Sequence, residues 1–158
     1  MAQAILGRPV AEDALILGIS GRYEFKNKGI DVFIDAMGQL NRNNGLGKEV
    51  LAFILVPAGH AGANKELLHN LELPYQAVTS TDLYLTHYLN DSANDPVMNR
   101  IRAQKLRNSE EDKVKIFFVP SYLNGDDGVF NMPYYDLLVG MDLTAFPSFI
   151  KMQGINLL

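Results

Sequence analysis

Four short apolar runs constrain the fold of this chain more than any other feature. They are rich in β-branched and aromatic side chains and occupy residues 15–20, 50–57, 114–120 and 143–147. None of the four alternates regularly between polar and apolar residues. A near-continuous apolar run is typical of a parallel strand that helices cover on both faces of the sheet. We therefore expect four buried strands in a parallel sheet.

The segments between these runs carry helical patterns. After the first run, apolar side chains recur at the spacing of one helical face: Ile30, Phe33, Ile34, Met37 and Leu40. This pattern predicts an amphipathic helix packed on the sheet. Two shorter helices are predicted at residues 64–69 and 81–89.

A further helix is predicted to begin at Pro96. Asp95 is a suitable N-cap, and proline is favoured at the first helical position. Met98 and Ile101 would face inward, whereas the outer face carries cations: Arg100, Arg102, Lys105 and Arg107. We interpret this cationic face as solvated, with contact to a phosphate or an acidic partner as the alternative.

The alternation of strands and helices predicts an α/β fold. With right-handed crossovers it gives a Rossmann-like parallel sheet with helices on both faces. A length of 158 residues fits one modest domain. We expect this domain to span residues 1–148 and a divergent tail to occupy residues 149–158.

Composition excludes several broad classes of protein. Hydrophobic residues make up 47% of the chain, too many for a disordered protein, and no apolar stretch is long enough to span a bilayer. The absence of cysteine excludes disulfides and thiolate metal sites. A formal charge of −4 provides no overall basic field for nucleic acid. With no secretory signal in the first ten residues, we expect a cytoplasmic protein without a nucleic-acid or membrane partner.

The histidines and paired aspartates give no sign of a metal site. His60, His69 and His87 lack ligand spacing, so we expect them to be surface or loop residues. Asp126 and Asp127 lie between two glycines and are typical of a solvated turn.

The densest chemical signal is the GISGRYEFKNKG segment between the first run and the first helix. It combines glycines with Arg22, Lys26 and Lys28 at a strand-to-helix turn, where backbone N–H groups and cations favour a phosphate. It contains neither a GxGxxG fingerprint nor a P-loop. An exposed basic loop, partly neutralised by Glu24, is the alternative interpretation.

This segment also carries a family resemblance. GRYEFKNKG, followed by IDVFIDAMGQLN, resembles the donor-binding lobe of animal and fungal glycogen synthases, which are retaining glycosyltransferases with two Rossmann-like lobes. NDSANDPVMNRIRAQKLRN, DKVKIFFVPSYL and YYDLLVGMDLTAFPS follow the order of the family's motifs. The resemblance covers most of residues 15–148 and implies part of the C-terminal lobe of such an enzyme.

The resemblance implies roles for four residues. Arg22 and Lys28 would contact the diphosphate of a UDP-glucose or ADP-glucose donor, and Tyr122 and Tyr134 would flank its nucleobase. The family needs no metal, and no cofactor is implied. No catalytic residue is assigned in this chain.

The chain also departs from the family. The histidine and glutamate of the family's HPEFL motif are replaced by Val119 and Ser121, and residues 149–158 lack the Glu-x7-Glu motif that bears PWGYTP. The resemblance implies that the complete enzyme transfers glucose to an α-1,4-glucan. Only that complete enzyme would bind the glucan acceptor. We expect this chain to carry part of the donor site and to be inactive alone. A standalone nucleotide-binding, phosphate-binding or regulatory module is the alternative, and a truncated product without function is a third possibility.

Overall fold

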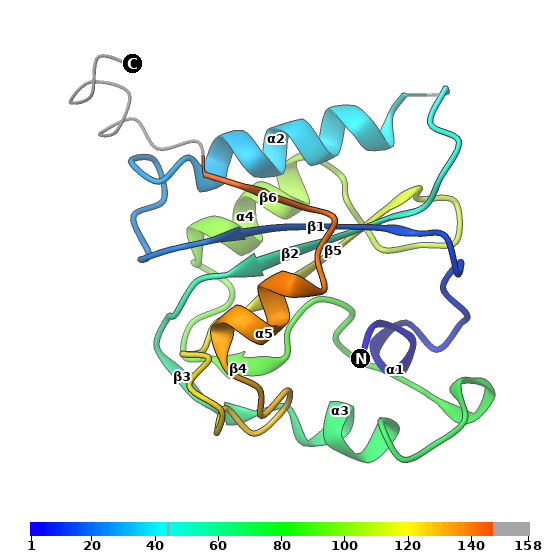
Figure 1. Cartoon of the computed structure of the whole chain (residues 1–158), viewed down its shortest axis with the longest axis vertical. Coiled ribbons are helices and arrows are strands. Elements are labelled where there is room, and N and C mark those ends of the chain that lie inside the picture. The colour runs from blue at the N-terminus through cyan, green and yellow to red at the C-terminus, as the bar shows by residue number, and fades with distance from the viewer. Residues whose placement is uncertain (44, 147–158) are drawn as a thin grey trace.

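A four-stranded parallel sheet forms the centre of the computed structural model, which describes residues 1–43 and 45–146. Its strands are β1 (Leu15–Ser20), β2 (Val50–Leu55), β5 (Val114–Val119) and β6 (Leu143–Ala145), and their order in space is β5-β2-β1-β6 (Figure 1). All four strands begin within the apolar runs, so the prediction of a parallel sheet is confirmed. The predicted tail at residues 149–158 lies outside the described residues.

Helices cover both faces of the sheet. Helices α2 (Ile30–Asn41) and α4 (Pro96–Ala103) lie on one face, and α1 (Ala2–Leu6), α3 (Lys65–Asn70) and α5 (Tyr134–Val139) lie on the other (Figure 1). Neighbouring residues of one strand enter different cores: Phe118 packs in the core under α2 and α4, and Phe117 packs in the core beside α1 and α3. Burial on both faces explains the unbroken apolar runs and confirms the Rossmann-like α/β prediction.

The two main helices form where their sequences predicted them. In α2, Ile30, Phe33, Ile34 and Met37 are buried against the sheet. In α4, the Asp95 carboxylate accepts a hydrogen bond of 3.0 Å from the Met98 N–H, which confirms the predicted cap. Helix α3 also forms, with Asn64 as its N-cap.

The prediction of a helix at residues 81–89 is wrong. The Phe118 N–H donates to the Tyr84 carbonyl at 2.9 Å, and the Thr86 N–H donates to the Phe118 carbonyl at 3.2 Å. This segment is therefore extended along the outer edge of β5 and continues into β4 (His87–Leu89), which pairs antiparallel with β3 (His60–Ala63). The unpaired edge of β5 offers backbone partners that outweigh local helix propensity.

The buried side chain of Asn70 closes a loop in the first part of the link from α3 to β4. Its amide group donates to the carbonyls of Ala4 at 3.3 Å and Thr79 at 3.0 Å. The short 3₁₀ helix η1 (Tyr75–Ala77) lies within this link.

The cationic face of α4 contacts α2 through Arg100. Arg100 donates from Nε and one terminal nitrogen to the two Asp35 oxygens of α2, at 2.7 and 2.5 Å. Hydrogen bonds from Arg100 lower the pKa of the Asp35 carboxyl against the opposing effect of its burial. Arg100 is thus exposed to solvent, as expected, and in addition joins α4 to α2. Within residues 1–43 and 45–146, no helix has the length and apolar character needed to cross a membrane.

Candidate nucleotide-binding site

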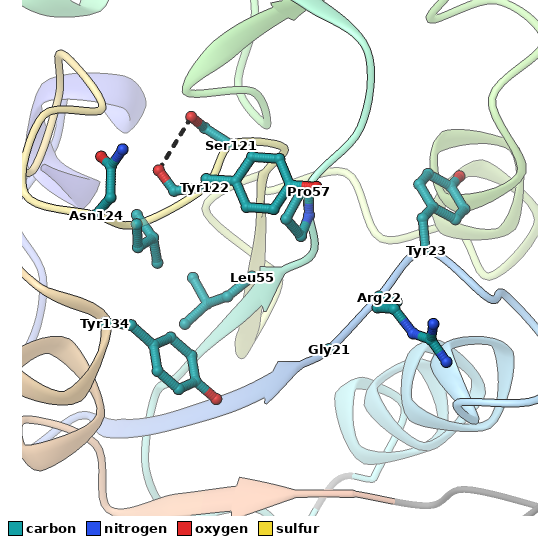
Figure 2. A pocket seen from close by; sticks show the side chains of 10 residues that line it. Gly21, Arg22, Tyr23, Leu55, Pro57, Ser121, Tyr122, Asn124 and Tyr134 are labelled. Carbon is teal, nitrogen blue, oxygen red and sulfur yellow. Dashed lines mark hydrogen bonds between the residues drawn. The ribbon is translucent and has the colours of Figure 1, made fainter.

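A cavity of about 520 Å³ lies where β1, β2 and β5 end (Figure 2). Ligands of open α/β sheets bind at this carboxyl edge, because the loops that follow parallel strands converge there. The cavity is lined by Gly21, Arg22, Tyr23, Leu55, Pro57, Ser121, Tyr122, Leu123, Asn124 and Tyr134. We call this cavity the donor crevice below.

The cationic loop after β1 forms one wall of the donor crevice. Gly21 has φ of 144°, a conformation that side chains rarely adopt, so this turn requires glycine. The Arg22 side chain is 81% exposed, and its guanidinium extends away from Tyr122 and Tyr134 (Figure 2). Lys28 is not among the lining residues, although its Cδ atom would lie 3.9 Å from a Cβ atom placed on Gly21.

Tyr23 fastens this loop to α4. Its hydroxyl donates to Asp95 Oδ2 at 2.8 Å and accepts from the Val97 N–H at 3.2 Å. Burial, together with the hydrogen bond to Asp95, raises the pKa of the Tyr23 hydroxyl well above its usual value. A neutral, doubly hydrogen-bonded phenol therefore holds the backbone next to Arg22 in place.

The two tyrosines at the opposite wall differ in exposure and in hydrogen bonding. Tyr134 is half-buried, its hydroxyl is hydrogen-bonded to the Ser20 hydroxyl at the end of β1, and its N–H donates to the Leu123 carbonyl at 3.0 Å. Tyr122 is 75% exposed. Figure 2 shows Leu55 between the two rings. The crevice thus has one aromatic ring held by a hydrogen bond and one ring that is largely exposed.

A loop closed at its base connects the two tyrosines. Asn124 and Pro133 form a bridge at its two ends. Inside it, the carboxylate of Asp127 accepts hydrogen bonds of 2.8 to 3.0 Å from the N–H groups of Val129, Phe130 and Asn131. Asp127 is 9% exposed, so its interpretation as a solvated-turn residue is wrong. Its carboxylate holds the backbone of the loop together by these hydrogen bonds.

The side chain of His87 holds this loop against β4. The ring is completely buried, with Nε2 at 2.7 Å from the Asp127 carbonyl and Nδ1 at 2.8 Å from the Thr86 hydroxyl. Because a carbonyl only accepts, Nε2 carries the proton and donates it. The expectation that His87 is a surface or loop residue is therefore wrong. His60 lies beside it, with ring centroids 4.8 Å apart, and burial together with His87 lowers the pKa of His60.

The structure thus brings three of the four predicted site residues, Arg22, Tyr122 and Tyr134, around one crevice, and it leaves Lys28 beside the rim. Sequence reasoning missed the supporting contacts of Ser20 and Tyr23. Their partners lie far away in the sequence, so no local pattern could have indicated them. Across residues 1–43 and 45–146, no group of three or more His, Asp or Glu side chains is placed to hold a metal ion.

Comparison with known proteins gives the family of the chain. The sequence model of the glycogen synthase family matches residues 10–82 and 76–156, which together cover most of the chain. The chain belongs to the glycogen synthase family. It is 29% identical to glycogen [starch] synthase isoform 2 of Saccharomyces cerevisiae, 27% identical to glycogen [starch] synthase of Neurospora crassa and 26% identical to the liver enzyme of Rattus norvegicus.

The chain spans less than a third of the length of these relatives. Each alignment covers 90% of this chain but only 27 to 29% of the relative. The alignment with the yeast synthase runs over 203 residues, more than the whole chain contains, so that relative has internal residues that this chain lacks. The two matches to the family overlap at residues 76–82, within the link from α3 to β4.

Proposed function

We propose that this chain is the donor-binding part of a glycogen synthase. The complete enzyme would transfer glucose from UDP-glucose or ADP-glucose to an α-1,4-glucan. The observation that carries the proposal is the donor crevice itself, where a cationic loop and two tyrosines meet at the carboxyl edge of the sheet. That combination offers a diphosphate and a nucleobase their preferred partners within one cavity.

Arg22 and Lys28 are the residues we propose for the diphosphate. The guanidinium of Arg22 can give a phosphoryl group two parallel hydrogen bonds, a geometry that lysine cannot provide. Because the leaving diphosphate gains negative charge as the glycosyl bond breaks, cations beside it stabilise the transition state more than the bound donor. The exposed Arg22 side chain has room to turn into the crevice, since little protein covers it.

Tyr122 and Tyr134 are the residues we propose for the nucleobase. Stacking requires only an aromatic face and an aromatic partner, so uracil and adenine are both suitable. The fixed ring of Tyr134 provides a rigid surface, and the exposed ring of Tyr122 can close over the base.

The remaining parts of the proposal concern the whole enzyme. Residues 1–148 form the nucleotide-sugar-binding domain, the glucan is bound only by the complete enzyme, and the location is cytoplasmic. The isolated chain binds the donor without elongating glycogen, because transfer also requires an acceptor held in line with the donor. Incubation of the pure chain with glycogen and labelled nucleotide-glucose should give no incorporation. Steady incorporation, free of contaminating synthase, would contradict this part of the proposal.

Calorimetry of the isolated chain with UDP, ADP and UDP-glucose tests the donor crevice. A hydrogen bond to a charged group contributes about 1.5 to 3 kcal/mol, so Arg22→Ala should weaken diphosphate binding by roughly 10- to 150-fold. Lys28→Ala should act in the same direction. Arg102→Ala is the matched control, because Arg102 donates to Asn99 and to the Ser92 carbonyl outside the crevice. Wild-type affinity in all three variants would place the phosphate site elsewhere.

A further inference from the structure

One carboxylate oxygen lies between the two cations proposed for the diphosphate. Oε2 of Glu24 is 3.6 Å from a terminal nitrogen of Arg22 and 3.8 Å from Nζ of Lys28. The oxygen is buried, and within residues 1–43 and 45–146 it has no hydrogen-bond partner. Both cations therefore share a single carboxylate oxygen that solvent does not reach, on a side chain that is one-third exposed.

The backbone of the loop places the three groups together. The Glu24 N–H donates to the Arg22 carbonyl at 2.8 Å, and the Lys28 N–H donates to the Glu24 carbonyl at 2.9 Å. Glu24 and Lys28 are thus one helical turn apart, a spacing at which side chains meet. The three charged groups of these ion pairs thus lie within seven consecutive residues, on a backbone that its own hydrogen bonds fold together.

These ion pairs are weak enough to be exchanged. Neither distance is short enough for a hydrogen bond, and pairs with exposed partners contribute little stability. The guanidinium is directed away from the two tyrosines (Figure 2), and its pairing with Glu24 accounts for that direction. A diphosphate would offer each cation a phosphoryl group of its own, with shorter, charge-assisted hydrogen bonds.

We propose that Glu24 is an exchangeable counter-ion: Arg22 and Lys28 leave it when a nucleoside diphosphate binds and return to it when the diphosphate departs. The inference rests on the proposed function of the donor crevice. Glu24 then acts as an internal competitor that weakens binding and speeds release of the nucleotide product. The competition acts most strongly on diphosphates, because a diphosphate displaces the shared carboxylate from both cations and a monophosphate displaces it from only one.

A purely structural role for Glu24 predicts the opposite result. If the carboxylate served to order the loop, its neutralisation would disorder Arg22 and Lys28 and weaken binding. The sign of the change in affinity therefore separates the two roles. Glutamine at this position keeps the size of the side chain and removes only its charge.

Calorimetry and stopped-flow measurements with UDP, UMP and uridine test the proposal on the full chain. Glu24→Gln should strengthen UDP binding by about two- to fivefold, the range expected for an exposed ion pair, and should slow UDP dissociation accordingly. Uridine affinity should not change, because a nucleoside has no phosphate. UMP should gain less than UDP, because its single phosphoryl group displaces Glu24 from only one of the two cations. Glu12→Gln, at an exposed position with the same charge change, is the control and should have no effect.

A double-mutant cycle identifies the partner of Glu24. The gain from Glu24→Gln should shrink in an Arg22→Ala, Lys28→Ala background and at high salt, because it depends on those charges. Unchanged or weaker UDP binding by Glu24→Gln would overturn the counter-ion proposal while leaving the donor crevice intact. No UDP binding by any form of the chain would overturn the donor crevice, and the counter-ion proposal with it.

Discussion

The hydroxyl group of Tyr23 donates a hydrogen bond of 2.8 Å to Asp95 and so joins the loop that carries Arg22 to the first turn of α4. The two oxygens of Asp95 have separate tasks, because Oδ1 caps the helix and Oδ2 accepts from the tyrosine. One carboxylate thus links the stability of a helix to the position of the loop that carries Arg22.

Tyr23→Phe should lower both stability and affinity. The change removes a buried hydroxyl that makes two hydrogen bonds, and we expect the free energy of unfolding to fall by about 1 to 2 kcal/mol in urea titrations. UDP binding should also weaken, since the backbone next to Arg22 loses its anchor. Tyr135→Phe is the control, because the Tyr135 side chain is exposed. Unchanged stability in Tyr23→Phe would show that the contact contributes nothing.

Two substitutions at Tyr134 separate stacking from positioning. Tyr134→Ala removes the ring and should reduce UDP affinity by the free energy of one stacked base, about 1 to 3 kcal/mol. Tyr134→Phe keeps the ring but loses the hydrogen bond to Ser20, so its loss should be smaller. Calorimetry that gives equal losses would argue that the hydroxyl, and not the ring, contacts the nucleotide.

His87→Ala should destabilise the loop between the tyrosines. It leaves the Asp127 carbonyl without its hydrogen-bond donor, removes one partner of the Thr86 hydroxyl and opens a cavity, so we expect a loss of about 2 to 4 kcal/mol. Limited proteolysis should then cut first between residues 124 and 133. His69→Ala, at an exposed position, should behave as the wild type in both measurements.

Acid should remove the contribution of the pair between Asp35 and Arg100. Because the folded-state pKa of Asp35 is lowered from 3.8, its stabilisation is present above that value and is lost as pH falls through the folded-state pKa. Urea titrations at pH 7 and pH 3 should therefore show a difference in stability between wild type and Asp35→Asn that shrinks at low pH. Asp126→Asn, which changes an exposed carboxylate, should show no such trend.

The sequence predicted the parts of this fold that are determined locally. The strands and α2 follow from runs and spacings that a short window contains, and Asp95 caps α4 through the N–H of Met98, three residues away. The segment at residues 81–89 was mispredicted because its conformation depends on backbone partners in β5, about 30 residues further along the chain. Propensity cannot include such partners.

The same limit applies to the site. Arg22 lies in a compact motif, and family resemblance identified the tyrosines, whose positions in the crevice depend on topology. His87 was misjudged because its two hydrogen bonds reach a neighbouring residue and a carbonyl 40 positions away. A single buried polar side chain leaves no periodic pattern in the sequence. Its burial can be seen only in the folded structure.

The hydrogen bond from the Asn70 side chain to the Thr79 carbonyl closes a loop whose length can vary. This hydrogen bond holds the two ends of the loop at residues 70–79 together. Residues added between these ends would therefore lengthen the loop without shifting α3 or β4. The cost in loop entropy grows only slowly with length. The two family matches overlap at residues 76–82, around the end of this loop. The yeast relative has internal residues that this chain lacks. The hydrogen bond from a single asparagine thereby allows the segment between residues 70 and 79 to lengthen during evolution while its two ends stay together.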